Sequence, residues 1–279
     1  MTHDMSSVLR ALLPQALARF LRGIYAGKIG FHGRFRNWQQ AQMASSGYGR
    51  PDILDKVRGT ALRAKRGEIA YEQDGVAFLK PAPSYPALCG LLLAGANHKG
   101  EIRVLDFGGS LGSMYFRNRA LLAQSPGLLW GIVEQPHFAA IGRTEFESDT
   151  LLFFDDIASC RQRTRPNIAL LSGVLQYLEH PYRTIKEIKD TAVDFIVVDR
   201  TPFTDAAEDF VTVQTVPPSA QRVSYPSWIF SKSAFEAAFH PEYRVVSGFA
   251  AIDDILGDRN VRAQFRGMIL SRSARDGLA

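Results

Sequence analysis

One short stretch of the sequence carries the residues best suited to chemistry. Residues 104–116 read VLDFGGSLGSMYF, an apolar run that ends in an aspartate and breaks at once into glycines and serines. Residues 108–112 match the G-x-S-x-G turn on which hydrolases expose a nucleophilic serine. Together with Asp106, the three glycines of this stretch equally match a turn whose backbone N–H groups hold a nucleotide. The rest of the chain has to decide between a hydrolytic serine and a nucleotide-binding turn.

The stretch lies near the start of a regular alternation of short apolar runs and helix-like segments, which begins at residue 101. Such alternation is typical of parallel βα units with helices on both faces of the sheet. We therefore expect an α/β, doubly wound fold, with helices over 113–123, near Phe138, over 174–190 and over 232–239. The expected strands occupy residues 102–107, 128–134, 150–156, 167–173, 194–199, 243–252 and 264–272.

Four of the first five expected strands carry an acidic residue at, or one residue before, their carboxyl end. Ligands of such sheets bind outside the carboxyl ends of the strands, next to helix N-termini. Glu134 stands 22 residues after Gly112, a spacing at which an acidic residue receives ribose hydroxyls. Asp156 lies where its carboxylate could accept a hydrogen bond from the amino group of adenine. A single acidic residue at a strand end, however, more often caps the next helix. Together these residues predict a nucleoside-binding edge.

The turn itself argues against a dinucleotide and for a cationic ligand. The G-x-G-x-x-G fingerprint fails, because Phe107 interrupts one register and Ser110 and Ser113 interrupt the other. Asp106 would repel a pyrophosphate and attract an ammonium group. S-adenosylmethionine (SAM) carries an ammonium group, a ribose diol and no phosphate, so it fits these residues better than NAD.

The chain resembles class I SAM-dependent methyltransferases in four segments, namely VLDFGGSLGS, IVE, LLFFDDI and LLSGVLQYLEHP. From FHGRFRNWQQAQMASSGYG to VSYPSWIF it is similar to a family of proteins assigned as methyltransferases and often associated with bacterial surface-polysaccharide genes. The resemblance implies a Rossmann-like fold of seven mostly parallel strands with the last strand antiparallel. It also implies that the cofactor is held by Asp106, Gly108, Gly109, Ser110, Gly112, Glu134, Asp156, Ile157 and Ser172, with Ser110 in place of the usual middle glycine.

Two other functions remain open at this level. A serine hydrolase of the α/β type would use Ser110, Asp199 and His240, which occur in the required chain order. Asp106, however, would place negative charge close to the developing oxyanion. A methyltransferase-like fold can also act as a catalytically silent binding module, because fold alone does not confer activity.

The methyl acceptor is expected over the long connection between residues 200 and 230. A loop of this length in a compact domain is usually functional. Arg200, Arg222, Tyr225 and Trp228 suit an anionic group and a sugar ring. These residues predict a small or saccharide-type, anionic acceptor that is phosphorylated, nucleotide-linked or lipid-linked.

Few other side chains have an obvious chemical role. If the acceptor must lose a proton, His137 and His180 are the candidate bases. No grouping of His, Cys, Asp and Glu has the spacing of metal ligands, so no metal is expected. The two cysteines, Cys89 and Cys160, lie far apart and form no C-x-x-C pair, which fits a reducing cytoplasm.

Most of the positive charge lies in the first 66 residues. They contain 12 Lys or Arg and three Asp, a balance of +9, which leaves −4 for the other 213 residues of a chain with net charge +5. We divide the chain into a basic, helical or irregular cap over 1–100 and a Rossmann-like SAM-binding domain over 101–279. In the cap, helices are expected over 38–44, capped by Asn37, and over 51–65.

The cap is expected to begin with an amphipathic helix. Apolar residues recur at helical spacing between Leu9 and Ile24, with three arginines among them. Such a helix packs on the main domain, makes peripheral contact with anionic lipid at the inner face of the membrane, or attracts a phosphate-bearing substrate. In the last case the basic segment and the connection between residues 200 and 230 form the acceptor site together. We expect no secretory signal and no spanning helix. Nucleic acid is not an expected partner, because no recognisable nucleic-acid-binding motif accompanies the charge.

Overall fold

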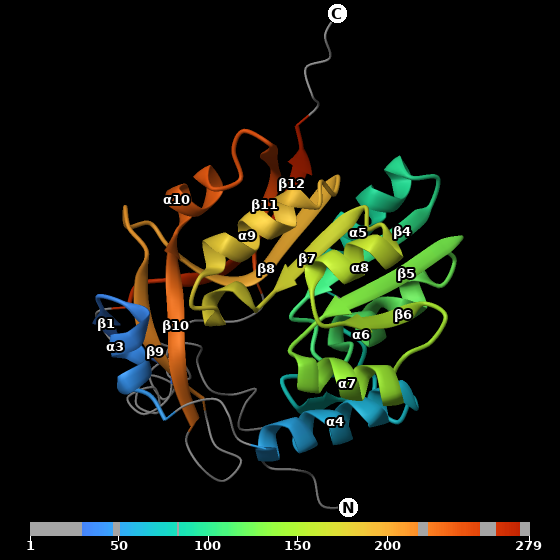
Figure 1. Cartoon of the computed structure of the whole chain (residues 1–279), viewed down its shortest axis with the longest axis horizontal. Helices are drawn as coiled ribbons and strands as arrows, with labels where there is room; N and C mark the ends of the chain where they lie inside the picture. Colours follow the sequence, from blue (N-terminus) through green and yellow to red (C-terminus); the bar gives the residue numbers. More distant parts are fainter. Residues whose placement is uncertain (1–29, 47–50, 83, 217–222, 252–260, 274–279) are drawn as a thin grey trace, which may run out of the picture.

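The computed structural model describes residues 30–46, 51–82, 84–216, 223–251 and 261–273. Its centre is a ten-stranded sheet with helices on both faces (Figure 1). Seven strands form the main part of this sheet, namely β4 (Glu101–Phe107), β5 (Gly127–Val133), β6 (Leu151–Phe154), β7 (Ile168–Ser172), β8 (Phe195–Thr204), β11 (Tyr243–Ala250) and β12 (Gln264–Arg272).

The seven strands lie in the order β6-β5-β4-β7-β8-β12-β11. The first five are parallel to one another, whereas β12 is antiparallel to both β8 and β11. This is the strand order of the class I methyltransferase fold, with its reversed last strand. The predicted fold is therefore confirmed, and each predicted parallel strand forms within a few residues of its expected position, except that β8 continues five residues further.

The helices that lie between these strands in the chain are α6 (Ser113–Leu122), α7 (Pro136–Glu145), α8 (Ile157–Thr164), α9 (Pro181–Asp190) and α10 (Lys232–Ala237). One expected helix is wrong in part. Residues 174–190 form a short 3₁₀ turn, η1 (Leu175–Tyr177), and then α9. The break falls before Pro181, because a proline disfavours helical backbone at the residue before it, and His180 has φ −124° and ψ 66°.

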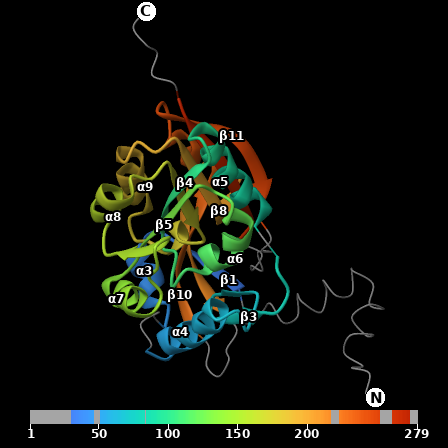
Figure 2. The same ribbon diagram turned by 90° about the vertical axis from the view of Figure 1, so that its right-hand side faces the viewer.

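Two apolar layers hold the helices on the sheet. Figure 2 shows α8 and α9 on one side of the strands and α5 (Tyr85–Asn97) and α6 on the other. Leu91 of α5 and Met114 of α6 belong to the cluster on one face, while Cys160 of α8, Ile185 of α9 and Phe235 of α10 belong to the other. Strands covered on both faces have to be apolar throughout, which explains the uninterrupted runs that predicted them.

The first hundred residues add further elements to this core. Helices α3 (Trp38–Met43) and α4 (Pro51–Lys65) form as predicted, and the Asn37 side chain accepts a hydrogen bond from the Gln40 N–H at 3.0 Å. Strand β1 (Gly30–Phe35), the hairpin of β2 (Tyr71–Gln73) and β3 (Val76–Phe78), and α5 were not predicted. Because α5 packs against β4, β7 and β8, it belongs structurally with the sheet. The division at residue 100 stays a prediction.

The connection between residues 200 and 230 is not a loop, contrary to expectation. Strand β8 runs on to Thr204, and β9 (Phe210–Val216) and β10 (Val223–Ser231) follow as an antiparallel pair. Strand β1 pairs with β9, and β10 pairs with β8 at Phe203 and Thr204, beyond the end of β7. We call these three added strands, β1, β9 and β10, the branch. The β-branched and polar residues of β9, FVTVQTV, are a strand signal that the sequence contained.

A β-bulge interrupts β8 where the branch begins. Val198 pairs with Met268 and Thr201 with Arg266, so Asp199 and Arg200 together face Gly267. Arg200 has φ +50°, a left-handed conformation that is costly for a residue other than glycine. Bulges often redirect a side chain next to a functional site, and this one sits beside the largest cavity described below.

Within the described ranges, no helix has both the length and the apolar composition needed to cross a bilayer. The amphipathic helix predicted between Leu9 and Ile24 lies outside those ranges, so its packing or membrane role stays a prediction.

Candidate functional site

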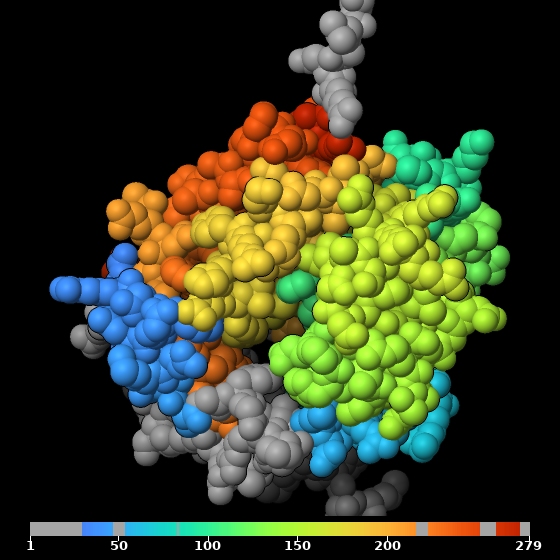
Figure 3. All heavy atoms as spheres, viewed as in Figure 1, coloured from blue at the N-terminus to red at the C-terminus, as the bar shows by residue number. Residues whose placement is uncertain are grey.

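A cavity of about 700 Å³ lies between the carboxyl ends of β4, β5 and β7 on one side and the branch on the other. We call it the donor cavity, after the methyl donor that the sequence predicts at this edge of the sheet. Figure 3 shows the surface hollowed between the lime-coloured elements around α7 and the yellow elements around η1. The predicted site residues that line it are Asp106, Gly108, Gly109, Ser110, Glu134, Ser172, Arg200 and Tyr225.

The turn after β4 is shaped by close contacts that require its glycines. Gly108 has φ +73°, and an added Cβ would lie 2.3 Å from a methyl group of Val174. At Gly109 an added Cβ would lie 2.5 Å from a carboxylate oxygen of Asp106. Ser110 occupies φ +54°, a conformation that glycine adopts more easily. The serine in place of the middle glycine is therefore accommodated by local backbone strain.

Asp106 is a buried carboxyl at the floor of the donor cavity, 1% exposed. The indole Nε1–H of Trp130 donates to its Oδ2 at 2.9 Å. Burial raises the pKa of Asp106 to about 7, and the neighbouring Glu134 adds to the rise. Near neutral pH this group therefore exists in both protonation states, and a bound cation would favour the ionised one.

Glu134 links the first two strand ends of the donor cavity. Its Oε1 accepts from the Ser110 N–H at 3.1 Å, and its Oε2 accepts from the Gln135 N–H at 2.8 Å. Burial raises the pKa of Glu134, whereas these two backbone donors lower it. Each carboxylate oxygen can accept a second hydrogen bond, so Glu134 both fixes the glycine turn and can receive hydroxyl groups of a ligand.

Three predicted cofactor residues do not line the donor cavity. Asp156 caps α8, because its carboxylate accepts from the Ser159 N–H and the Ser159 hydroxyl, both at 2.7 Å. Ile157 begins α8, and Gly112 lies at the start of α6 with φ +99°. The neighbouring Asp155 lines the cavity instead. A contact between Asp156 and a ligand stays a prediction.

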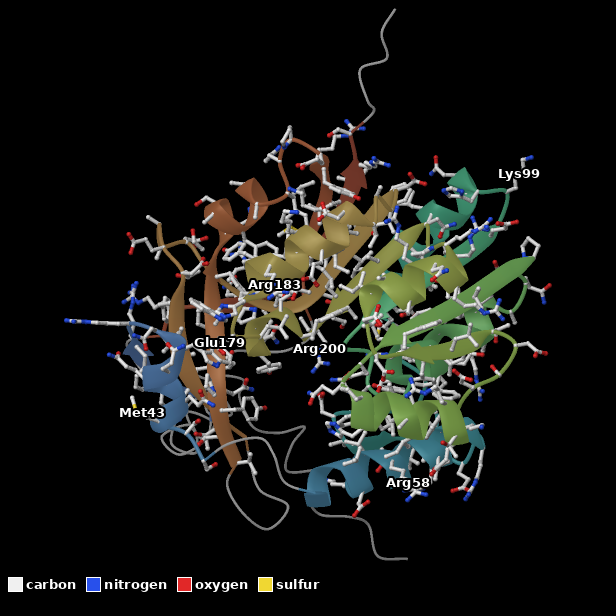
Figure 4. The ribbon with its side chains drawn as sticks, in the orientation of Figure 1. Met43, Arg58, Lys99, Glu179, Arg183 and Arg200 are labelled. Atoms are coloured by element: carbon white, nitrogen blue, oxygen red, sulfur yellow. The ribbon has the colours of Figure 1, made fainter. Side chains whose placement is uncertain are left out.

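The predicted acceptor residues are only partly brought together. Arg200 lies in the space between β10 and the parallel strands (Figure 4), and its guanidinium donates to an Asp74 carboxylate at 2.8 Å. Tyr225 meets the ring of Tyr177 edge to face, with centroids 5.2 Å apart. Trp228 does not line the cavity but stacks on Trp38, which does. Arg222 lies outside the described residues.

Sequence reasoning missed a carboxylate that the β2–β3 hairpin brings to the donor cavity. Glu72 is 2% exposed, accepts from the Gly75 N–H at 2.7 Å, and accepts from the Ser113 hydroxyl. Burial raises the pKa of Glu72. The Asp74-Gly75 pair was a readable hairpin signal, but strands of three residues are too short to be predicted with their partners.

The two predicted histidine bases are exposed and do not line the donor cavity. His137 lies in the first turn of α7, and His180 precedes α9. The position of the two histidines therefore does not support a role as bases. The side chains lining the cavity that could accept a proton are carboxylates.

The serine hydrolase alternative is wrong, because the sheet separates its triad. Ser110 follows the carboxyl end of β4. His240 precedes β11, whose first residue lies at the amino-terminal edge, since Tyr243 and Phe195 pair with adjacent residues of β12. Serine and histidine therefore lie at opposite edges of the sheet, and no proton can pass directly between them.

No protein-family model and no curated protein matches this sequence. Among solved structures, the N-terminal domain of EvdMO1 in the presence of SAH (S-adenosylhomocysteine) and D-fucose is similar at a TM-score of 0.44 and 17% identity, covering 81% of this chain and 97% of that one. SAM-bound CalS10, an amino pentose methyltransferase from Micromonospora echinaspora, has a TM-score of 0.42 and 12% identity, covering 68% and 91%. Magnesium protoporphyrin IX methyltransferase from Synechocystis PCC 6803 has a TM-score of 0.43 and 11% identity, covering 85% and 89%. Because these identities and TM-scores are low, we assign the class I methyltransferase fold from the strand order of this chain and not from its similarity to these structures.

Proposed function

We propose that this chain is a SAM-dependent methyltransferase, cytoplasmic, that acts on a small, saccharide-type acceptor with an anionic group. The observation that carries the proposal is the placement of Asp106 and Glu134 around one glycine turn at the edge of a class I methyltransferase sheet. A ligand complementary to this edge offers a cation to one carboxylate and hydroxyl groups to the other. SAM has both groups and carries no phosphate that the carboxylates would repel.

The donor side of the cavity fits SAM residue by residue. Asp106 faces the ammonium group, and its ionised form is favoured when that group is bound. Glu134 accepts the ribose hydroxyls with the lone pairs that Ser110 and Gln135 leave unused. When bound, SAM supplies a methyl group that is already activated by its sulfonium centre. The chain's main task is then to hold donor and acceptor in line.

The opposite side of the cavity supports a sugar-like, anionic acceptor. Trp38, Tyr177 and Tyr225 present aromatic surface, on which the apolar face of a sugar ring can stack. Arg200 lines the same cavity and offers a guanidinium, the group that pairs best with carboxylate or phosphate. An acceptor bound there would have to compete with Asp74 for this guanidinium.

Glu72 is the residue we propose for receiving the proton of an acceptor hydroxyl. Of the other carboxylates that line the cavity, Asp106 and Glu134 hold the donor, while Asp74 and Asp155 pair with Arg200 and Arg143. During transfer the acceptor oxygen bonds to the methyl carbon, the carbon–sulfur pair stays on sulfur, and the hydroxyl proton moves to Glu72. Its raised pKa makes it a better base at neutral pH than an exposed glutamate.

A thermal-shift titration tests donor binding directly, because a ligand that binds only the folded state raises the melting temperature. We expect SAM and SAH to stabilise the protein and NAD to have no effect. The Glu134→Ala variant should lose the stabilisation. Stabilisation by NAD, or none by SAM and SAH, would contradict the proposal.

A screen of radiolabelled methyl transfer from SAM onto neutral and anionic saccharides tests the acceptor class. We expect transfer to anionic saccharides, and a preference for neutral ones would contradict the role of Arg200. SAH binding without transfer to any saccharide would instead favour another acceptor class or a silent binding module.

A further inference from the structure

A second cavity, of about 640 Å³, lies at the far end of β8, where the start of β12 and the branch come together. We call it the arginine cavity. Its side chains include three arginines, one carboxylate and two aromatic rings, namely Arg34, Arg262, Arg266, Asp205, Phe203 and Phe210. It shares no lining residue with the donor cavity.

The branch separates the two cavities, because they use opposite faces of its strands. Phe210, which lines the arginine cavity, packs with Phe31 and Ile229. The next residue, Val211, packs with Ala41 and Trp38 on the other face, as expected for successive residues of a strand. Trp38 lines the donor cavity. A ligand of the arginine cavity is therefore distinct from a methyl donor or acceptor in the donor cavity.

Two of the arginines are held in place by uncharged groups. The Arg34 guanidinium carbon lies 4.3 Å from the centre of the Phe210 ring, in a cation–π contact. The Arg266 guanidinium donates from Nη2 and Nε to Gln264 Oε1, at 2.8 and 3.2 Å. Neither partner cancels the positive charge. The contacts therefore orient the two guanidinium groups, which lowers the entropic cost of using them to bind an anion.

The charge of the lining residues favours an anionic ligand. Three arginines stand against the single carboxylate of Asp205, and arginine remains charged at any physiological pH. A planar guanidinium forms paired hydrogen bonds with phosphate oxygens. The volume is larger than one phosphate group requires, and it lies within the usual range for small-molecule sites.

We propose that the arginine cavity binds the phosphate group of a larger molecule, separately from methyl transfer. The phosphate would lie between Arg34 and Arg266, with Arg262 at the rim, while the rings of Phe203 and Phe210 contact the less polar part of the ligand. The same chemistry is offered by a soluble phosphorylated compound and by the headgroup of an anionic phospholipid, and the experiment separates these two sources.

The soluble source is tested by calorimetric titration of the full chain with sodium pyrophosphate, with sodium chloride matching the ionic strength. We expect saturable binding that weakens roughly tenfold or more in the Arg34→Gln/Arg266→Gln double variant, because each lost contact is to a charged group. The Arg183→Gln variant is the matched control, since Arg183 is an exposed arginine on α9 (Figure 4). SAH affinity should be the same in all three proteins, which separates this test from that of methyl-donor binding.

The lipid source is tested by flotation with vesicles of phosphatidylcholine alone or mixed with phosphatidic acid. Binding to the mixed vesicles that the double variant loses, and the control keeps, would assign the cavity to a headgroup. If the double variant weakens neither pyrophosphate binding nor vesicle binding, because each is absent from the start or unchanged, the proposal is overturned. The single variant Arg262→Gln, at an exposed position, repeats the test if the double variant has a lowered melting temperature without ligand.

Discussion

The two sides of the donor cavity are built in different ways. One side, which we call the parallel side, is formed by the ends of the parallel strands. Asp106 lies near the end of β4 and Glu134 directly follows β5, and the pairing of Phe107 with Val133 sets the distance between these two carboxylates. On the branch side, the cavity is closed by segments distant in the sequence. There, the contacts of Arg200 with Asp74 and of Tyr177 with Gln214 join the β2–β3 hairpin, η1, β8 and β9.

This difference separates what is general in the fold from what is particular to this chain. Backbone hydrogen bonds between the parallel strands β4 and β5 bring Asp106 and Glu134 to the same edge of the sheet, where ligands of such folds bind. The branch side depends on side-chain contacts and on the Asp199–Arg200 bulge, which other chains with the fold need not share. Donor recognition should therefore depend on the parallel side and acceptor choice on the branch side.

Removing the Glu134 side chain is the strongest test of whether donor binding depends on the parallel side. We expect Glu134→Ala to weaken SAH binding about 100-fold, because it removes hydrogen bonds to a charged group and releases the Ser110 N–H of the turn. Calorimetric titration measures the change. Glu187→Ala, at an exposed carboxylate of α9 that pairs with Arg183, is the control and should leave SAH affinity unchanged. Asp156→Ala at the next strand end should lower the free energy of unfolding by about 1 kcal/mol through loss of a helix cap.

On the branch side, Arg200→Gln should have the opposite pattern. We expect kcat/KM for an anionic saccharide to fall by roughly tenfold to 100-fold, because a charged hydrogen bond is lost, while the SAH dissociation constant stays the same. Asp74→Asn is a useful companion, since it frees the Arg200 guanidinium from its carboxylate partner and should raise acceptor affinity. A large loss of SAH binding in Arg200→Gln would show that the two sides are not independent.

The protonation of Asp106 gives a pH-dependent test of the parallel side. Burial raises the pKa of this carboxyl to about 7, so the folded protein without a ligand holds the proton more tightly than the unfolded chain does. This group's contribution to the free energy of unfolding therefore falls as pH rises from 3.8 to about 7.

Binding an ammonium group requires the ionised carboxylate. SAH affinity should accordingly rise up to about tenfold between pH 6 and pH 8, which calorimetry in buffers of different ionisation enthalpy can measure. Asp106→Asn should flatten this dependence. An unchanged slope in that variant would assign the titration to another group.

The smallest expected effect concerns the strained serine of the turn. Ser110→Gly should raise the free energy of unfolding by up to about 1 kcal/mol, because a left-handed backbone costs serine more than glycine. Ala140→Gly, at an exposed position of α7, is the control and should lower it by about 1 kcal/mol. Urea unfolding measures both. A loss of stability in Ser110→Gly as large as that in Ala140→Gly would contradict the strain at Ser110.

Much of the parallel side could be predicted from the sequence, because local patterns determine it. The five parallel strands could be predicted from uninterrupted apolar runs, which are typical of strands buried on both faces. Asp106 and Glu134 could be predicted as site residues because they lie at the ends of two of these runs. The prediction for Asp156 shows the limit of this reasoning, since the same acidic residue suits a ligand contact and a helix cap, and in the structure its carboxylate binds Ser159.

The branch side could not be predicted in the same way. The alternating residues of β9 and β10 were present in the sequence, but their length and position suggested a loop. Glu72 gave no signal, because nothing near it in sequence shows that the β2–β3 hairpin packs against Ser113. The two histidines were proposed as bases by residue type alone, and residue type does not reveal which side chains reach a cavity.

The sequence alone determined the succession of strands and helices along the parallel part of the chain and the chemistry at the ends of β4 and β5, because hydrophobic periodicity and glycine spacing act over a few residues. Only the tertiary structure decided which distant segments complete the cavity, that Ser110 and His240 lie at opposite edges, and that three arginines surround a second hollow. The two cavities depend on how β8 bends at Asp199 and Arg200 and on which strand pairs beyond that bend. The separation of Ser110 and His240 depends on the pairing of β12 with β8 and β11. Pairing between residues far apart in the chain is set by packing of the whole molecule and leaves little trace in any local pattern.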